Sequence, residues 1–375
     1  MSRKINILFF ELRHKVGGIE VFLYNLFQKI DKERFQFHFI TSVAEPAFEK
    51  EIKESGGIIY HIPSSNHFFQ YMDGIKRILK TEKFDIIHIN KNSACNIIPF
   101  YLAKKYGCQA ILAHAHNTSP STGRLTRLLH HMNKKYLLHC MDRGVACSTV
   151  AAQWLYGKRY CTENQVTILK NGVDTTKFSF EPMQRSIVRK KLNLDDKLVI
   201  GHVGRFMKQK NHKFLIEVFY ELLKKEKNAV LMLIGDGELK DKCIQQSRTL
   251  GIEENILFLG KRTDISDLML AMDIFAMPSL YEGLPVAGVE AQTSGLPLIV
   301  SDSVSKELKI ADAVTYVSLD ESKNKWADKI LENVGTVDRT NAFIKMREAG
   351  YDMTNTSEIL SKMYLKMAKG VNTSE

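Results

Sequence analysis

Short apolar runs alternate with amphipathic stretches along almost the whole chain. The runs have strand length and are rich in Ile, Val, Leu and Phe, while the stretches between them repeat apolar residues every three or four positions. This alternation predicts parallel strands joined by crossover helices, which is the pattern of an α/β fold. No apolar run reaches the roughly 18 residues that a membrane-spanning helix needs.

The first half of the chain contains a complete series of such elements. Strands are predicted at residues 5–10, 37–41, 58–61, 85–89, 109–113, 144–147 and 166–169. Helices are predicted between them at residues 19–29, 47–55, 69–81, 94–105, 124–139 and 148–155.

A second series follows a break in the pattern. Residues 174–194 lose their periodicity, carry Pro182 and mixed charge, and are predicted to connect two domains. Strands are then predicted at residues 198–203, 229–234, 256–259, 274–277 and 298–300, with a last helix at 357–368. Two α/β series in 375 residues indicate two Rossmann-like domains facing across a cleft, with ligands at the carboxyl ends of the strands.

The net charge of +11 is unevenly distributed. Residues 1–180 hold 25 Lys and Arg against 14 Asp and Glu, and the rest of the chain holds 28 of each. The basic half favours an anionic partner for that half, with general solubility as the alternative. The six cysteines form no C-x-x-C pair, so neither a zinc ribbon nor a disulfide framework is indicated, and a reducing cytoplasm fits.

Two carboxylates stand out in the second half, in SLYEGLPVAGVEAQTSGLPLIVSD at residues 279–302. Glu282 and Glu290 lie eight positions apart, across a loop and into a helix whose first turns are residues 287–291. Backbone N–H groups at a helix start attract anions, and a carboxylate accepts strongly from a pair of sugar hydroxyls. The segment therefore suits a sugar linked to phosphate.

A basic pair follows the strand at residues 198–203. Gly204, Arg205 and Lys210 come just after its end, where a guanidinium and an ammonium can hold a diphosphate and neutralise its charge. A strand-end Arg or Lys alone is usually solvated surface. The acidic pair on the same sheet edge favours the functional interpretation.

The first strand leads through ELRHKV to Gly17-Gly18 and a helix. Two glycines let the backbone approach a ligand closely at a helix start, although a simple turn is the alternative. The chain has neither a G-x-G-x-x-G at this point nor a G-x-x-x-x-G-K-[ST], which argues against a nicotinamide enzyme and a P-loop ATPase.

The strand at residues 109–113 ends in His114-Ala115-His116. Alternation puts His114 and His116 on one face, where a neutral imidazole can donate to a sugar hydroxyl or a phosphate oxygen. A metal site is the rival interpretation, but no third ligand is evident nearby. For His114 a structural role is favoured.

The helix at residues 124–139 is amphipathic. Its apolar face consists of Leu125, Leu128, Leu129, Met132 and Tyr136. Its polar face consists of Arg124, Arg127, His131, Lys134 and Lys135. Such a helix either lies on an anionic membrane surface or packs on the core with a solvated basic side.

Together these motifs resemble the retaining, nucleotide-sugar-dependent glycosyltransferases with the GT-B architecture, family GT4. The resemblance covers nearly the whole chain. Its motifs are Gly17-Gly18 with Glu20, His116, Asn171-Gly172-Val173-Asp174, Gly204-Arg205 with Lys210, Gly235-Asp236-Gly237, and the pair Glu282 and Glu290. AHAHNTSPS at residues 113–121 is similar to the capsule and exopolysaccharide branch.

The resemblance implies a role for each motif. Glu290 would bind the ribose hydroxyls, Glu282 the hydroxyls of the donor hexose, and His116 would approach the donor sugar. The catalytic set is thus His116, Glu282, Arg205 and Lys210. The donor-binding set is Gly17, Gly18, Gly204, Arg205, Lys210, Arg262 (through its backbone, at the base), Glu282, Gly283, Leu284, Pro285 and Glu290.

The same resemblance implies the domain organisation and cofactor use. Residues 1–178 would bind the acceptor, residues 195–352 the nucleotide sugar, and residues 353–375 would form a helix crossing back to the first domain. No metal and no other cofactor is expected. Pro285, which has no N–H, and Ala287-Gly288 depart from the family pattern and point to a shifted donor selectivity.

The expected reaction is hexosyl transfer with retention from a nucleotide-diphosphate sugar, with UDP as the expected nucleotide. The acceptor would be a glycan or a polyprenyl-diphosphate-linked sugar in bacterial capsule or exopolysaccharide synthesis. The enzyme would be cytoplasmic or peripheral at the inner face of the membrane, with no nucleic-acid partner. The alternatives are a UDP-sugar epimerase of the same fold and a non-catalytic nucleotide-sugar-binding protein.

Overall fold

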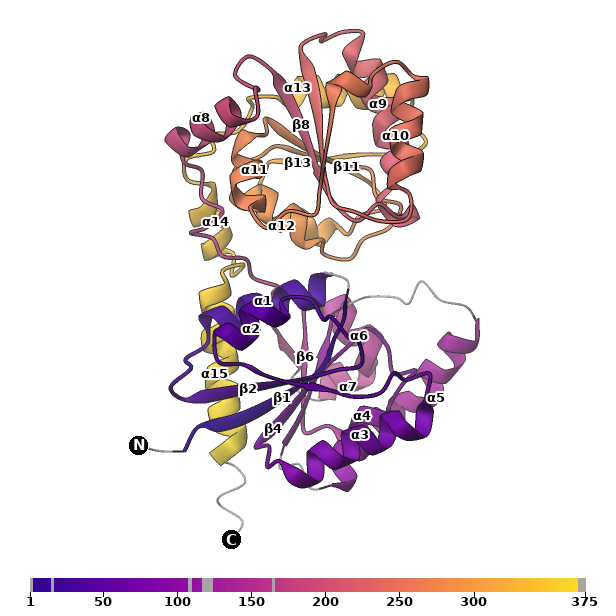
Figure 1. Cartoon of the computed structure of the whole chain (residues 1–375), viewed down its shortest axis with the longest axis vertical. Helices are drawn as coiled ribbons and strands as arrows, with labels where there is room; N and C mark the ends of the chain where they lie inside the picture. The colour runs from indigo at the N-terminus through magenta and orange to yellow at the C-terminus, as the bar shows by residue number, and fades with distance from the viewer. Residues whose placement is uncertain (1–2, 15–16, 107–109, 117–123, 164–165, 370–375) are drawn as a thin grey trace. The chain divides into compact units, whose positions relative to one another are not determined.

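The chain folds into two units, each built on its own parallel sheet (Figure 1). The first unit consists of Met1–Gly172 and Met353–Glu375, and the second of Val173–Asp352. The computed structural model describes residues 3–14, 17–106, 110–116, 124–163 and 166–369.

Within the described residues, the sheet of the first unit has the strand order β3-β2-β1-β4-β5-β6-β7, and every neighbouring pair is parallel. Most of these strands are buried on both faces, which explains why they form continuous apolar runs in the sequence. The strands are β1 Ile5–Leu12, β2 Phe35–Thr41, β3 Ile58–His61, β4 Ile86–Lys91, β5 Ala110–Ala115, β6 Arg143–Ala146 and β7 Thr167–Ile168.

Helices cover both faces of this sheet. The helices are α1 Gly18–Lys29, α2 Glu49–Glu54, α3 Phe68–Thr81, α4 Ile98–Lys105, α5 Arg124–Cys140, α6 Thr149–Tyr156, α7 Lys158–Glu163 and α15 Met353–Lys369. On one face α1 and α15 enclose a core that includes Phe9, Phe22 and Tyr364. On the other face α3, α4 and α6 enclose a core that includes Phe10 and Phe100. The last helix of the chain is therefore an integral layer of the first unit.

The second unit repeats this plan. Its described strands have the order β10-β9-β8-β11-β12-β13, again all parallel. They are β8 Leu198–Val203, β9 Ala229–Ile234, β10 Ile256–Gly260, β11 Ile274–Met277, β12 Leu298–Ser301 and β13 Val314–Val317. The helices are α8 Pro182–Lys191, α9 His212–Leu223, α10 Lys240–Thr249, α11 Ile265–Ala271, α12 Val286–Thr293, α13 Lys323–Asn333 and α14 Ala342–Glu348.

Both strand orders reverse direction in the middle of the sheet, between β1 and β4 and between β8 and β11. Ligands of open parallel sheets bind outside the carboxyl ends of the strands at such a reversal. In the second unit this position is occupied by the residues that follow β8 and β11. These two segments contain Arg205, Lys210 and Glu282.

The predicted connection at residues 174–194 is wrong in part, because these residues belong to the second unit and include α8. Pro182 is at the first helical turn, and the Glu181 carboxylate accepts from the backbone N–H groups of Met183 and Gln184. Arg189 is buried and donates to backbone carbonyls, among them that of Ala271 at 2.7 Å. A buried arginine takes the place of an apolar residue on this helix, so the spacing of apolar residues does not predict the helix.

Candidate active site

Glycines join the carboxyl ends of β8 and β9. The Gly204 N–H donates to the carbonyl of Ile234 at 2.9 Å, and the Phe206 N–H donates to that of Asp236 at 3.0 Å. Gly235 has a φ of 142°, and a Cβ there would lie 2.1 Å from the Gly204 carbonyl oxygen. Only glycine permits this approach. The Gly235-Asp236-Gly237 motif therefore lets the loop after β9 pack directly against the backbone of the loop after β8.

The loop after β8 is also bonded to the loop after β11. The Leu280 N–H donates to the Gln209 carbonyl at 2.8 Å, and the Gln209 amide donates to the carbonyl of Tyr281 at 2.9 Å. Asn211 has a φ of 55°, in the left-handed region, and its amide donates to the Pro278 carbonyl at 3.1 Å. These bonds hold two segments some seventy residues apart in fixed register.

Lys210 and Glu282 form an ion pair at this junction. The Lys210 Nζ lies 2.5 Å from the Glu282 Oε1, and both side chains are largely buried. The Ser279 hydroxyl donates to the same carboxylate oxygen at 3.2 Å. A Cβ at Gly204 would lie 3.2 Å from the Lys210 Cδ, so this glycine leaves room for the lysine stem. The structure thus brings two predicted site residues together, and adds Ser279, which the sequence did not suggest.

Arg205 and Arg262 lie further out on the same unit. The Arg205 guanidinium contacts the Glu238 carboxylate at 3.3 Å, in the loop after β9. Arg262, in the turn after β10, forms a bidentate pair with Asp264 at 2.7 and 2.5 Å. Neither guanidinium pairs with the carboxylate of Glu282.

The loop between Glu282 and α12 presents free backbone donors. Pro285 is the N-cap of α12, and its carbonyl accepts from the Gly288 N–H at 3.0 Å. Across the part of the chain that the structure describes, no acceptor is found for the N–H groups of residues 283, 284, 286 and 287. Pro285 lacks an N–H but caps the helix without strain, at a φ of −71°. The row of donors can therefore bind an anion.

Glu290 lies on α12, and its carboxylate has no hydrogen bond or ion pair among the described residues. Burial of the carboxyl raises its pKa to about 7, an effect that the charge of Lys177 partly offsets. A carboxyl of this kind is available for a ligand and is about half ionised at neutral pH.

Gly288, one of the departures from the family pattern, has a packing role. A Cβ there would lie 2.9 Å from a methyl carbon of Leu308. The glycine therefore lets α12 pack closely against the short helix at Lys306–Leu308.

In the first unit, Gly17 and Glu20 form the start of α1. Gly17 is the N-cap, and a Cβ there would lie 2.9 Å from the Glu20 Oε2. Glu20 is buried, which raises its pKa, and its hydrogen bonds to its own N–H and that of Gly17 oppose this rise. A glutamate at the third helical position that reaches back to the N-cap is half of a capping box. The Gly17-Gly18-x-Glu20 motif thus has a structural role beside any contact of Gly18 with a ligand.

His114 and His116 lie on one face at the end of β5, with ring centroids 3.9 Å apart. His116 Nε2 lies 2.7 Å from the Asn90 Oδ1, and His114 Nδ1 lies 3.1 Å from His88 Nε2. Burial lowers the pKa of His116 to about 3, so its ring is neutral at physiological pH. Among the described residues, no group of three or more potential ligands is placed to hold a metal ion. Residues 117–121 of the AHAHNTSPS motif lie outside the described part of the chain.

Of the two interpretations of α5, the structure tests the packing of its apolar face on the core. Leu125, Leu128 and Met132 are 68%, 56% and 66% exposed, and the residues that this helix buries are instead His130, Leu137 and Cys140. Packing of the predicted apolar face on the core is therefore wrong. No helix in the described ranges is both long enough and apolar enough to cross a bilayer.

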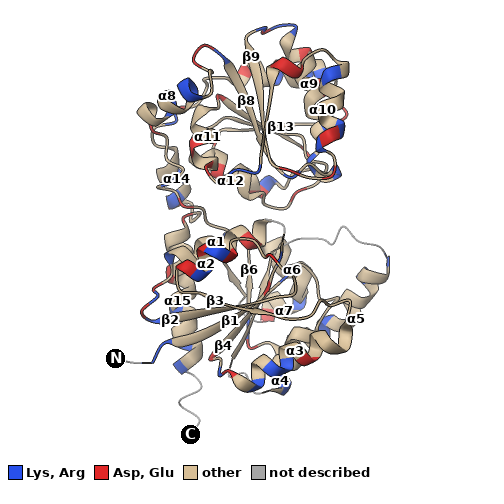
Figure 2. Ribbon diagram, in the orientation of Figure 1, with Lys and Arg blue, Asp and Glu red and all other residues tan. Residues whose placement is uncertain are grey.

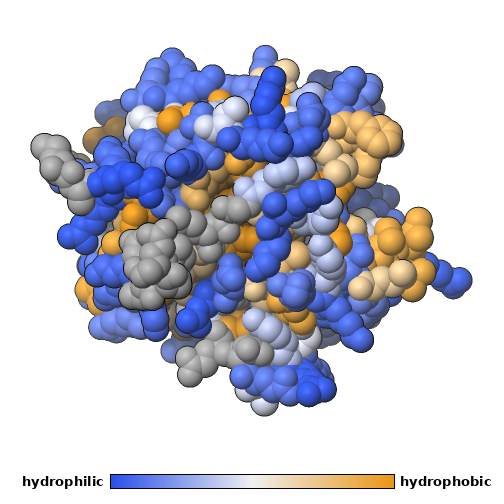
Figure 3. Space-filling view, turned by 90° about the horizontal axis from the view of Figure 1, so that it is seen from below, coloured by the Kyte–Doolittle hydropathy of each residue, from blue (hydrophilic) through white to orange (hydrophobic). Residues whose placement is uncertain are grey.

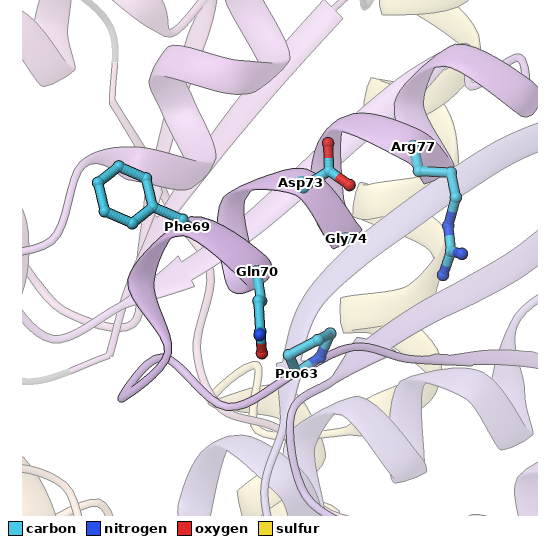
Figure 4. A pocket seen from close by; sticks show the side chains of 6 residues that line it. All are labelled: Pro63, Phe69, Gln70, Asp73, Gly74 and Arg77. Carbon is cyan, nitrogen blue, oxygen red and sulfur yellow. The ribbon is translucent and has the colours of Figure 1, made fainter.

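A pocket of about 430 Å³ lies beside α3 and contains no residue of the predicted donor-binding set. Figure 4 shows its side chains, in which the ring of Phe69 points away from Gln70 and Pro63. Phe69 is 84% exposed.

Comparisons with known proteins identify the family of the chain and its fold. Residues 16–177 match the model of Glycosyltransferase Family 4, and residues 184–337 match that of Glycosyl transferases group 1. EpsF of Bacillus subtilis, which is named as a glycosyltransferase, is 32% identical over 93% of this chain and 93% of its own length. The Escherichia coli UDP-Gal:alpha-D-GlcNAc-diphosphoundecaprenol alpha-1,3-galactosyltransferase is 26% identical over 80% of each chain.

Among solved structures, that of HepE from Anabaena in complex with UDP superposes with a TM-score of 0.75. It is 19% identical and covers 96% of this chain and 100% of its own. At this identity the likeness concerns the fold alone, which is the GT-B fold predicted from the sequence. On its similarity to EpsF and on both domain models, the chain belongs to the glycosyltransferases of the family 4 and group 1 type.

Proposed function

We propose that the protein transfers a hexosyl unit from a UDP-sugar to a glycan or lipid-linked acceptor, with retention at the anomeric carbon. The observation that carries this proposal is the edge after β8 and β11, where Lys210, Glu282 and a row of free N–H groups adjoin the unpaired Glu290. UDP is the nucleotide bound to HepE, and the galactosyltransferase relative is named for a UDP-sugar donor and a lipid-linked acceptor. Family membership favours transfer over the epimerase and binding-protein alternatives.

Each part of the donor has a matching group in the second unit. The ionised Glu290 accepts from the ribose hydroxyls, and Glu282 accepts from hydroxyls of the hexose. The free N–H groups of the loop, with Lys210 and Arg205, bind the diphosphate. Lys210 then exchanges its contact with Glu282 for one with the phosphate, which leaves the Glu282 carboxylate for the sugar.

The charges of this site suit the departure of a diphosphate. When the bond between the anomeric carbon and the phosphate oxygen breaks, positive charge develops on the sugar and negative charge on the diphosphate. Lys210, Arg205 and the N–H row stabilise the negative charge without a metal ion. The acceptor hydroxyl attacks from the face that the diphosphate leaves, and its proton passes to the departing phosphate oxygen, so configuration is retained.

We expect NMR of the transfer product to show the anomeric configuration of the donor. The assay incubates the enzyme with a panel of UDP-hexoses and a polyprenyl-diphosphate-linked sugar, and the anomeric coupling constant of the product is then measured. A product with inverted configuration contradicts the same-face mechanism. If the enzyme transfers from a GDP-sugar but from none of the UDP-sugars, the proposed donor is wrong.

We also propose that the first unit binds an anionic membrane surface through α5 and its neighbours. The exposed apolar residues of α5 lie among the basic side chains Arg124, Arg127 and Lys135. Tyr101 of α4 lies against Tyr136 of α5, with ring centroids 6.4 Å apart. Figure 2 shows Lys and Arg along α3, α4 and α5. Figure 3, which views the molecule from below, shows apolar patches among hydrophilic residues. Exposed apolar groups mixed with basic ones are typical of interfacial helices.

Replacing Leu128 and Met132 by glutamate should weaken binding to anionic vesicles at least tenfold. Two apolar side chains no longer insert into the membrane interface, and the two new carboxylates are repelled by the anionic lipids. The measurement is co-sedimentation with vesicles of phosphatidylglycerol and phosphatidylcholine at low salt. Met183→Glu with Ile187→Glu is the matched control, since these residues are also exposed, apolar and one turn apart, on α8 of the second unit. Equal losses in both variants, or no sedimentation of the unmodified protein, contradict this proposal.

A further inference from the structure

Asn90 on β4 makes a direct contact with His116. The parallel register pairs Asn90 with His114, so its side chain lies on the same face of the sheet as the two histidines. Asn90 is buried, and its Oδ1 lies 2.7 Å from the His116 Nε2. An amide oxygen can only accept, so Nε2 carries the hydrogen of the neutral ring and Nδ1 keeps its lone pair.

Two polar atoms of this pair are left without partners. His116 Nδ1 and Asn90 Nδ2 are both buried and have no hydrogen-bond partner in the described part of the chain. An unsatisfied buried acceptor and an unsatisfied buried donor each cost free energy unless a ligand contacts them. A ligand hydroxyl satisfies the acceptor Nδ1, because it can donate a hydrogen bond to that atom.

The remaining surroundings lock the His116 ring in place. Its ring lies against that of His114 at a tilt of 34° and makes an edge contact with that of Phe22 at a centroid distance of 5.2 Å. His114 in turn contacts His88, whose Nδ1 lies 2.7 Å from the Tyr364 hydroxyl of α15. The titratable groups on the elements packed around this ring include Glu20 of α1, His88 and Lys91 of β4, His114 of β5 and Tyr364 of α15.

We infer that Asn90 is a positioning residue that fixes His116 in the Nε2–H tautomer, which leaves the Nδ1 of His116 to accept from a sugar hydroxyl. His116 then accepts from the sugar instead of donating to it. The inference rests on the proposed function for the identity of the ligand, while the tautomer is a property of the first unit alone.

The tautomer is measured directly by ¹⁵N NMR of the protein labelled on its histidine rings. His116→Gln identifies the signals of His116 by their disappearance. We expect the unliganded protein to show a protonated Nε2 and an unprotonated Nδ1 for this ring, and Asn90→Ala to change that pattern. A protonated Nδ1 in the unmodified protein overturns the inference, and this readout does not depend on whether transfer is observed.

Kinetics test the positioning role. Asn90→Ala should reduce kcat about tenfold or more through the lost orienting hydrogen bond, with the UDP affinity unchanged in calorimetry. Asn133→Ala is the control, since Asn133 is another asparagine of the first unit, and its amide donates to the backbone carbonyl of Cys95 at 3.2 Å. It should leave kcat unchanged. Full kcat in Asn90→Ala, or an equal loss in both variants, overturns the assignment.

Asn90→Asp gives a signature that a structural role does not produce. A carboxylate beside the ring favours the protonated imidazolium, which has no lone pair for the sugar hydroxyl. The transfer rate of this variant should therefore fall as pH decreases towards 5.5 and recover by pH 8. The unmodified protein should not show this decrease of the rate at low pH. A rate that is uniformly low across this range overturns the inference.

Discussion

Replacing Glu282 by glutamine should tighten the binding of UDP and at the same time reduce transfer. In the free protein the Glu282 carboxylate holds the Lys210 ammonium at 2.5 Å in a largely buried site. A neutral amide holds a cation much less strongly, so Lys210 becomes available to the diphosphate, and UDP affinity should rise roughly threefold to tenfold. Transfer should fall about a hundredfold, because the hexose loses a charged acceptor that stabilises the transition state.

Calorimetry with UDP and steady-state transfer rates give these two quantities separately. Glu238→Gln is the matched control, since it frees Arg205 from a pair that is 3.3 Å long and more exposed. Exposed ion pairs contribute little, so this control should change UDP affinity by less than about twofold. If UDP affinity and transfer rate fall together in Glu282→Gln, Lys210 does not exchange partners and the assignment of this pair is wrong.

The affinity for UDP should rise as pH increases from 6 to 8, through the ionisation of Glu290. Its pKa is raised to about 7 in the free protein, and only the carboxylate can accept from both ribose hydroxyls. Below pH 7 binding must first remove a proton, so affinity should weaken approaching tenfold for each further pH unit. Calorimetry at pH 6, 7 and 8 measures this dependence.

Glu290→Gln should bind UDP at least tenfold more weakly at pH 8 and without the pH dependence, because an amide oxygen is a weaker acceptor than a carboxylate. The same residue should make the unliganded protein less stable, not more, as pH rises. A carboxyl with a raised pKa contributes stability in its protonated form, and this contribution is lost as pH rises through about 7. The glutamine variant should therefore gain in Tm over the unmodified protein at pH 8 and gain less at pH 5.5. A UDP affinity that does not vary between pH 6 and 8 contradicts the role of Glu290.

Much of the fold follows from the sequence, because strands buried on both faces must be continuously apolar. The predicted strands at residues 198–203, 229–234 and 274–277 match the buried strands β8, β9 and β11 residue for residue. Elements without that pattern were not predicted. The helix α7 is short and buries none of its residues, and α8 buries Arg189 where an apolar residue was expected.

Chain order alone also locates the candidate site, since residues that follow parallel strands meet at one edge of a sheet. The contacts among these site residues could not be predicted from the sequence. The pairing of Lys210 with Glu282 depends on bonds between loops that are distant in the sequence, such as those of Gln209 with Leu280 and Tyr281. The exposure of α5 could not be predicted either, because a core-facing helix and an interfacial helix have the same 3.6-residue period.

We propose that the edge after β8 and β11 binds UDP through Glu290, the free N–H groups before α12 and the basic residues Arg205 and Lys210. Thermal unfolding with UDP, GDP and ADP, each with and without EDTA, tests it most directly. A ligand at 100 times its Kd should add about 2.7 kcal/mol to the free energy of unfolding. A clear rise in Tm with UDP that EDTA does not change, and that Glu290→Gln reduces, is the predicted result. No rise with any of the three nucleotides, or an equal rise in Glu290→Gln, contradicts it.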